Sequence, residues 1–306
     1  MNPFIALGCL ATMMLYAVPG FLLIKGKLVK EDHIPSFVRL LMFVCQPMLM
    51  IYSFLRVEYT PQTFQRMCVA FAIFFLSQLF TLGVHYYLTR KKQQDVAFRI
   101  YSAASSMGNC SFLGVPVLEA VLPHFPEALA YSAMASVSIN VLGWTAISTV
   151  ISRDTKYIRP KKILLNPVVL ALFVALPLFF TQTTLPTVLE NVVVSLGKMA
   201  SPLCMVIIGM RLATTSLKSV FLRWQNYVAV GVKQILFPLL VYAVVFLLPL
   251  KQELRQAAVI IASCPVATLV LSFAEMLGEG QKTAAGIVLL GTTCAAITMP
   301  LITMLL

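Results

Sequence analysis

The stretch "SSMGNCSFLGVPVLEAV" (residues 105–121) decides the fold, because it places turn-forming residues inside a long apolar segment. Gly108, Asn109 and Gly114 favour non-helical backbone, and Pro116 lacks the amide hydrogen that a helix interior needs. Such an interruption is tolerated inside a membrane only where the freed backbone faces protein or a water-filled cavity. The stretch therefore predicts a broken membrane helix beside a functional site.

The composition predicts an all-α polytopic membrane protein. The chain has 306 residues, of which 59% are hydrophobic and 11% are charged, and its mean hydropathy is +0.90. A soluble domain carries about 25% charged residues. Apolar runs long enough to cross a bilayer recur along the whole chain. We expect ten spans, at 3–24, 34–55, 64–88, 97–122, 126–151, 165–183, 188–212, 224–249, 255–277 and 282–305.

The positions of the basic residues predict the orientation of the chain. The net charge is +12, and Lys and Arg lie mainly in the odd-numbered connections between spans, including the longest loop, 152–167. Short loops rich in Lys and Arg stay in the cytoplasm. We therefore expect a multi-pass protein of the cytoplasmic (plasma or inner) membrane with both termini outside, and we expect no nucleic-acid partner.

The longest loop divides the chain into two halves that resemble each other. We expect a first five-helix repeat at 1–152, a cytoplasmic linker at 153–165 and a second repeat at 166–306. Because five is odd, the second half enters the membrane from the opposite side, which predicts the inverted repeat common in secondary transporters. The halves match in order at the pairs Asn2 and Asn166, Pro47 and Pro202, Asn109 and Pro265, and Glu119 and Glu275.

Spans four and nine are both predicted to be broken near the middle of the membrane. Asn109 lies about 18 Å along span four and Pro265 about 15 Å along span nine, in a core about 30 Å thick. A broken helix presents an N-terminus that attracts an anion; a plain proline kink is the alternative. The predicted substrate-binding residues are Gly108, Asn109, Ser111, Ser263, Pro265, Thr268, Lys233 and Gln46, and the predicted crossover or hinge residues are Gly114, Pro116, Pro47 and Pro202.

Charged residues inside spans indicate function, because an ammonium in a bilayer is costly. Lys233 lies deep in span eight, which favours a role in binding, whereas Lys198 is explained equally well by snorkelling to the outer surface. Glu119 and Glu275 return close to the membrane surfaces, so we expect interfacial or structural roles for them. With no carboxylate expected at the midplane, the site suits a small anion better than a cation.

No group of residues predicts catalysis, a metal or a cofactor. The seven cysteines lie in apolar runs without paired spacing, and no serine, histidine and carboxylate set forms a catalytic constellation. We therefore expect a protein that is not an enzyme and has no cofactor, with H⁺ or Na⁺ as candidate coupling ions.

Three motifs resemble the auxin efflux carrier family in its bacterial branch, within the bile acid/sodium symporter-like superfamily. They are "GNCSFLGVPVL" (108–118), "ASCPVATLVLSFAEMLG" (262–278) and "AAGIVLLGTTCAAITMPLI" (284–302). The resemblance implies ten spans in a 5+5 inverted repeat, with spans four and nine broken and crossing at mid-membrane. It also implies elevator-type transport and a homodimer.

By this resemblance, Asn109 and Pro265 match the crossover positions that hold the substrate's carboxylate in plant members. Ser111 stands where the family usually has Gly, and the long cytoplasmic loop of many plant auxin exporters is absent. These departures favour organic acids such as malate and malonate over auxin.

The sequence thus predicts a secondary transporter of a small organic anion, such as a dicarboxylate or an aromatic carboxylate. Its partners would be this substrate and the lipid bilayer. Two alternatives stay open: an uncoupled facilitator or channel, and a membrane sensor that binds a small molecule. An intramembrane enzyme is a third reading, but no catalytic set supports it.

Overall fold

The computed structural model describes residues 3–154, 165–216 and 220–306, and this part of the chain is helical without a β-strand. Asn2 and much of the basic loop, 155–164, lie outside the described residues. In chain order the helices are α1 (Pro3–Leu15), α2 (Ala17–Lys25), α3 (Ile34–Leu40), α4 (Gln46–Leu55), α5 (Pro61–Leu88), α6 (Val96–Ser106), α7 (Val115–Val121), α8 (Glu127–Leu142), α9 (Ser148–Ser152), α11 (Pro167–Thr181), α12 (Thr187–Thr214), α14 (Trp224–Gly231), α15 (Phe237–Leu247), α16 (Gln252–Ser263), α17 (Thr268–Leu277) and α18 (Gln281–Thr303).

Short turns of other helix types adjoin several of these helices. The π-helical turns continue directly into the helix that follows each of them, which lengthens α4, α7, α9 and α15. The π-helical turns are η2 (Leu41–Cys45), η4 (Cys110–Gly114), η5 (Gly143–Ile147) and η7 (Val232–Leu236), and the 3-10 turns are η1 (Glu31–His33) and η3 (Arg90–Lys92).

Seven helical segments in the described residues are long and apolar enough to cross a membrane. Three shorter apolar helices occupy the other segments in which the sequence predicts spans, so the count of ten spans stays a prediction. The seven are Leu7–Lys25, Glu31–Leu55, Pro61–Leu88, Glu127–Ser152, Thr187–Thr214, Trp224–Leu247 and Gln281–Thr303, and the shorter three are Cys110–Val121, Pro167–Thr181 and Thr268–Leu277.

Helix α11 begins where the Asn-Pro pair predicts a helix start. The side-chain oxygen of Asn166 accepts hydrogen bonds from the backbone N–H groups of Val168 at 2.8 Å and Val169 at 3.4 Å. Pro167 occupies the first turn, where its missing amide hydrogen costs nothing. The predicted start is therefore confirmed, and it is made by a side-chain cap.

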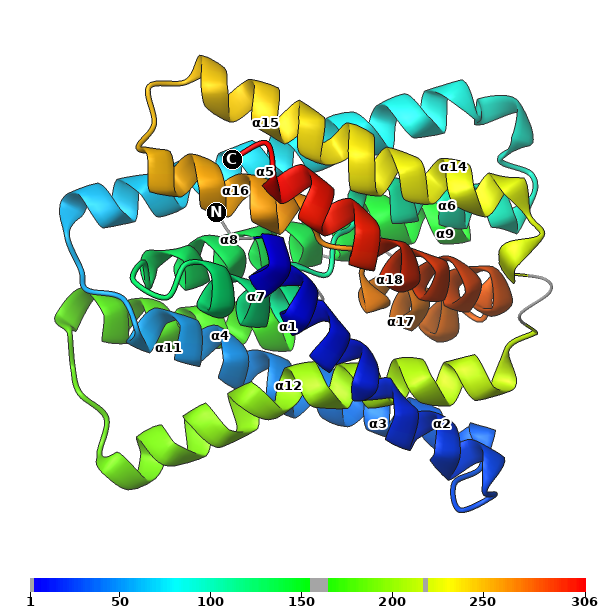
Figure 1. The fold of residues 1–306 in the computed structure, drawn as a ribbon, viewed down its shortest axis with the longest axis horizontal. Helices are drawn as coiled ribbons and strands as arrows, with labels where there is room; N and C mark the ends of the chain where they lie inside the picture. Colours follow the sequence, from blue (N-terminus) through cyan, green and yellow to red (C-terminus); the bar gives the residue numbers. More distant parts are fainter. Residues whose placement is uncertain (1–2, 155–164, 217–219) are drawn as a thin grey trace.

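Helices α2 and α12 cross in direct backbone contact, which Figure 1 shows in the lower half of the view. A Cβ added to Gly209 of α12 would overlap the carbonyl oxygen of Ala17, and one added to Gly20 would overlap the carbonyl oxygen of Val206. Small residues allow helices to approach this closely inside a membrane, where dispersion contacts drive association. This crossing holds the N-terminal helices on α12.

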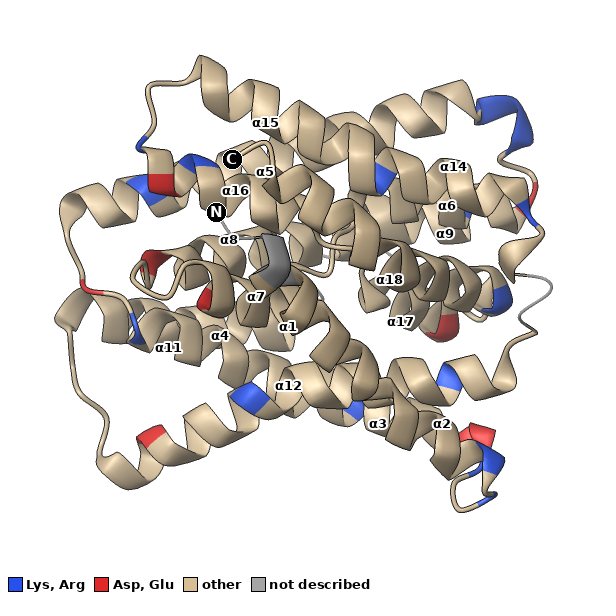
Figure 2. Ribbon diagram, viewed as in Figure 1, with Lys and Arg blue, Asp and Glu red and all other residues tan. Residues whose placement is uncertain are grey.

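The helix connections lie at two opposite ends of the molecule. In Figure 1 those between α4 and α5, between α11 and α12, and between α15 and α16 lie on the left. The connections after α2 and after α5 lie on the right, and Figure 2 shows blue, basic segments there. This arrangement agrees with spans that run between the two ends.

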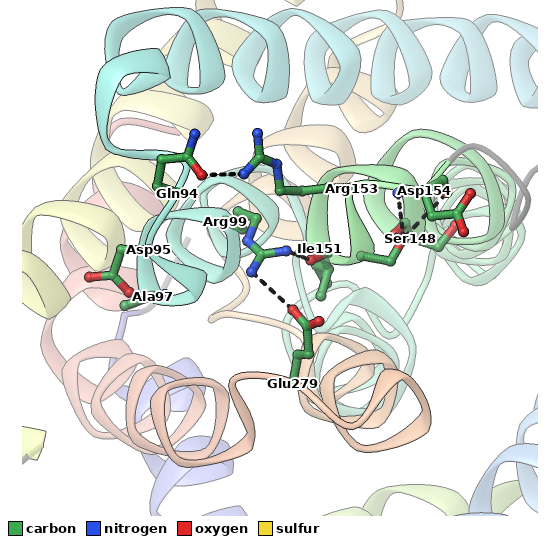
Figure 3. A network of polar contacts seen from close by, with 10 residues as sticks. Gln94, Asp95, Ala97, Arg99, Ser148, Ile151, Arg153, Asp154 and Glu279 are labelled. Carbon is green, nitrogen blue, oxygen red and sulfur yellow. Dashed lines mark hydrogen bonds and ion pairs between the residues drawn. The ribbon is translucent and has the colours of Figure 1, made fainter.

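A polar network joins α6 to the connection between α17 and α18. The Arg99 guanidinium lies 2.9 Å from a carboxylate oxygen of Glu279 and donates a hydrogen bond to the carbonyl oxygen of Ile151 (Figure 3). Arg99 is only 6% exposed, so its charge depends on these partners. The network ties α6, α9 and the end of α17 together at one end of the molecule.

We predict that Gly209→Ala lowers the thermal midpoint of the purified protein. The added methyl group must push α2 and α12 apart, and overpacking of this kind costs about 1–3 kcal/mol. A thermal-unfolding measurement in detergent checks this. The matched control is Gly231→Ala, because a Cβ there meets nothing within 4 Å. Equal midpoints for the two variants would contradict the close crossing.

Candidate functional site

Two interrupted helical segments meet backbone to backbone in the interior. Gly108, between α6 and η4, forms an isolated antiparallel bridge with Val266, between α16 and α17. The N–H of Ala267 donates to the carbonyl oxygen of Met107 at 3.0 Å, and the N–H of Asn109 donates to that of Pro265 at 2.7 Å. Each break therefore supplies hydrogen-bond partners to the other.

The backbone pairing satisfies N–H and carbonyl groups that both breaks leave without helical partners. Met107, Asn109 and Val266 are at most 3% exposed, so their backbone groups have no access to bulk solvent. An unpaired backbone group in such a place costs several kcal/mol in a membrane. The antiparallel bridge replaces the lost helical hydrogen bonds, so each break requires the other.

The buried ammonium of Lys233 closes the end of α16. Its Nζ donates to the carbonyl oxygen of Ala262 at 2.7 Å and to that of Cys264 at 3.0 Å, and its side chain is fully buried. A cation at a helix C-terminus is stabilised by the negative end of the helix dipole. A Cβ on Gly108 would lie 2.9 Å from Cε of Lys233, so only glycine leaves room for the lysine here.

A small cavity of about 20 Å³, with both polar and apolar side chains in its wall, lies at the two breaks. A volume of this size holds about one water molecule. Its described lining residues contribute amide and hydroxyl groups and no carboxylate. They are Gln46, Gly108, Asn109, Cys110, Ser111, Phe112, Ser136, Ile139, Asn140, Ala267, Thr268 and Leu269.

The first turns of both resumed helices line this cavity. Ser111 and Phe112 belong to the first turn of the segment Cys110–Val121, and Thr268 and Leu269 begin α17. The first N–H groups of a helix lack intrahelical partners and carry partial positive charge. Two such termini therefore bring partial positive charge to the wall of one cavity.

Helix α12 contacts both breaks through one cysteine that sequence analysis missed. The Cys204 sulfur lies 4.0 Å from Nδ2 of Asn109 and 3.5 Å from the hydroxyl of Thr268. In the sequence, Cys204 lies in an apolar run without paired spacing, like the other cysteines. Cys204 lies two residues after Pro202, in the span that corresponds to the span of Gln46 and Pro47. This position was the signal in the sequence that Cys204 lies near the breaks.

Asn140 links the cavity to the start of α11. Its side-chain oxygen accepts a hydrogen bond from Nδ2 of Asn166 at 3.2 Å, and its own Nδ2 donates to the carbonyl oxygen of Ser136 at 2.8 Å. Asn166 is the residue that caps α11. The helix cap and the cavity wall therefore share one hydrogen-bonded chain.

The structure brings five of the eight predicted binding residues to the cavity wall: Gln46, Gly108, Asn109, Ser111 and Thr268. The other three are close by but are not lining residues. Ser263 donates back to the carbonyl oxygen of Ile260 at 2.7 Å, Pro265 offers its carbonyl to Asn109, and Lys233 holds the end of α16. Substrate contact by any of the eight stays a prediction.

The predicted hinge residues occupy distinct positions. A Cβ on Gly114 would lie 3.2 Å from the Cys264 sulfur, so this glycine lets the two interrupted segments pack closely. Pro116 and Pro47 lie in the first turns of α7 and α4, and Pro202 lies inside α12. A role for these four residues in motion stays a prediction.

The two glutamates matched by the sequence lie away from the cavity wall and contact other polar groups. Glu119 accepts a hydrogen bond from the Tyr52 hydroxyl at 2.6 Å, and Glu275 forms an ion pair with Arg211. Both contacts are structural links between helices, of the kind that we expect for these residues. Lys198 is exposed, with its ammonium 5.6 Å from the ring centre of Tyr52.

The sequence profile of a family described as membrane transport protein matches the chain twice, over residues 6–159 and over residues 151–303. The chain belongs to this family. The assignment agrees with the resemblance to the auxin efflux carriers, and the two matches correspond to the two halves that the sequence predicts. No curated protein matches the chain. A multi-pass membrane transport protein of this family is a transporter, so the paired breaks and their cavity are its candidate transport site.

We predict that Lys233→Met destabilises the transporter by about 3 kcal/mol, because two carbonyl groups at the end of α16 lose a charged hydrogen-bond donor. Thermal unfolding in detergent measures this as a lower midpoint. Lys282→Met, at an exposed position in the first turn of α18, serves as the matched control and leaves the midpoint unchanged. A Lys233→Met variant as stable as the control would contradict the capping role.

Proposed function

We propose that the protein is a secondary active transporter that moves a small organic anion, such as a dicarboxylate or an aromatic carboxylate, across the cytoplasmic membrane. The observation that carries this proposal is the polar cavity at which two helix N-termini converge and which no carboxylate lines among the described residues. An anion bound there meets partial positive charge and several hydrogen-bond donors.

The proposal includes ten spans in a 5+5 inverted repeat, with spans four and nine broken and crossing at mid-membrane. Two observations support it: the described helices follow all ten predicted segments, and the family profile matches each half once. The direct pairing of Asn109 with Pro265 supports the crossing, because these positions correspond in the two halves.

Transport follows an elevator-type alternating access mechanism in this proposal. The cavity of about 20 Å³ holds one water molecule, so a carboxylate substrate enters only when neighbouring helices separate. The two interrupted helices are hydrogen-bonded together and therefore move as one body against α12 and α4. Domain motions of this kind take microseconds to milliseconds or longer.

The proposed environment follows from the charge distribution. The basic connections face the cytoplasm and both termini lie outside, because Lys and Arg lie mainly in the odd-numbered connections of the sequence. The coupling ion is H⁺ or Na⁺, and the protein works as a homodimer without a cofactor.

Uptake of radiolabelled malonate into proteoliposomes tests the proposal. We expect saturable uptake that depends on a proton or sodium gradient, and we expect Asn109→Ala to lower it at least tenfold, because a cavity-lining amide is lost. The control Asn191→Ala removes an exposed amide from α12 and leaves uptake unchanged. The absence of saturable uptake for dicarboxylates and aromatic carboxylates, with folded protein in the vesicles, would refute the proposed substrate class.

A further inference from the structure

A second, larger polar pocket lies apart from the cavity at the breaks. Its volume is about 610 Å³, and none of its lining residues is shared with that cavity. We call it the Arg56 pocket. Its walls are Arg56, Leu118, Glu119, Leu122, Pro123, His124, Phe125, Pro126, Leu129 and Lys198.

Two cationic side chains of this pocket gather around one aromatic ring. The Arg56 guanidinium carbon lies 5.5 Å from the ring centre of Tyr52, and the Lys198 ammonium lies 5.6 Å from it. Both cationic side chains are exposed, whereas Tyr52 is 1% exposed. The buried ring therefore holds two accessible positive charges near each other.

Glu119, which is the one carboxylate among the described residues that line this pocket, is hydrogen-bonded to Tyr52. Glu119 accepts the hydroxyl proton of Tyr52 at 2.6 Å, and Nε of Arg56 donates to the same hydroxyl oxygen at 3.4 Å. Among the described residues, no carboxylate oxygen lies within 4.0 Å of the nitrogens of Arg56 or Lys198. Arg56 therefore keeps guanidinium donors available for a ligand.

In the second half of the chain, the arginine that corresponds to Arg56 forms an ion pair with a carboxylate. Arg211 lies nine residues after Pro202, as Arg56 lies nine after Pro47, and it forms an ion pair with Glu275. The residue beside each arginine explains why Arg211 is paired with a glutamate and Arg56 is not. Tyr52, five residues after Pro47, corresponds to Ile207, which has no hydroxyl group to draw Glu275 away from Arg211.

A second substitution places extra positive charge in the Arg56 pocket. Lys198, four residues before Pro202, corresponds to Phe43, four residues before Pro47. Phe43 lines a pocket of about 450 Å³ with Arg39, Trp144 and Glu275, and there the glutamate is paired with Arg211. The Arg56 pocket thus has two cationic side chains among its described lining residues, whereas the other pocket has one, Arg39.

We propose that the Arg56 pocket is a second binding site for a carboxylate anion. Arg56 binds one carboxylate group through two parallel hydrogen bonds, and Lys198 supplies the second charge, which suits a dicarboxylate. Tyr52 holds the Glu119 carboxylate by a hydrogen bond. Glu119 therefore attracts Arg56 electrostatically, as Glu190 does, but forms no direct ion pair with it. The pocket concentrates substrate at one end of the transporter before it reaches the breaks, and only this loading role rests on the proposed function.

Calorimetric titration of the purified full-length protein with malonate tests this site, in an Asn109→Ala background that disables the central cavity. We expect Arg56→Gln and Lys198→Gln each to weaken malonate binding about tenfold, through the loss of one charged contact. Arg39→Gln, in the corresponding pocket at the other end, is the matched control and leaves the affinity unchanged. Unchanged affinity in both Arg56→Gln and Lys198→Gln, or an equal loss in Arg39→Gln, would overturn the inference.

Two further variants test whether the hydrogen bond from Tyr52 to Glu119 keeps Arg56 available for malonate. Tyr52→Phe releases Glu119 to pair with Arg56, so malonate affinity falls although no cation is lost. Glu119→Gln removes the competing charge and strengthens binding. If Tyr52→Phe and Glu119→Gln both bind malonate with unchanged affinity, Tyr52 does not keep Arg56 available and the proposed arrangement is wrong.

Two comparisons identify the source of the ligand and test whether the Arg56 pocket takes part in transport. The first compares two lipid compositions, and the second compares malonate binding with malonate uptake. Malonate that binds equally in phosphatidylcholine and phosphatidylglycerol nanodiscs supports a soluble carboxylate as the occupant, whereas displacement by phosphatidylglycerol would assign the pocket to a lipid headgroup and overturn the proposal. Binding that persists in a protein without malonate uptake supports the pocket while refuting the proposed transport. Normal uptake without binding at Arg56 refutes the pocket alone.

Discussion

The pairing of two backbone breaks is the interaction on which the rest of the structure depends. Met107 and Asn109 exchange hydrogen bonds with Ala267 and Pro265, in a place that bulk solvent does not reach. Neither break is stable alone, since a buried unpaired amide or carbonyl costs more than most side-chain contacts return. The two interrupted segments, far apart in sequence, therefore form one unit, and a small cavity lies at their junction.

No cationic side chain lines the central cavity among the described residues. The nearby ammonium of Lys233 is committed to carbonyl groups of α16, and Gly108 provides the space that it needs. This leaves the N-terminal turns of the segments that begin at Cys110 and Thr268 to face the cavity. A side-chain cation thus stabilises one helix end, while the first turns of two other helical segments line the cavity.

Helix α12 connects the regions of the molecule. Near its middle Cys204 contacts Asn109 and Thr268, and further along Gly209 lies against α2. Its last turns carry Arg211, paired with Glu275 of α17, and its first half carries Lys198 over Tyr52. The same helix thus contacts the breaks and the pockets at both ends.

The sequence by itself determined the helical class, the positions of the two breaks and the cap at Asn166, because hydrophobic length, glycine, proline and asparagine act locally on the backbone. It also paired Asn109 with Pro265. Only the tertiary structure decided the rotation of each helix about its axis. That rotation directs Lys233 to carbonyl groups, brings Cys204 to the breaks and holds Glu119 on Tyr52 while Glu275 meets Arg211. Spacing along a chain measures depth in a membrane, but the partner of a side chain depends on the neighbouring helices.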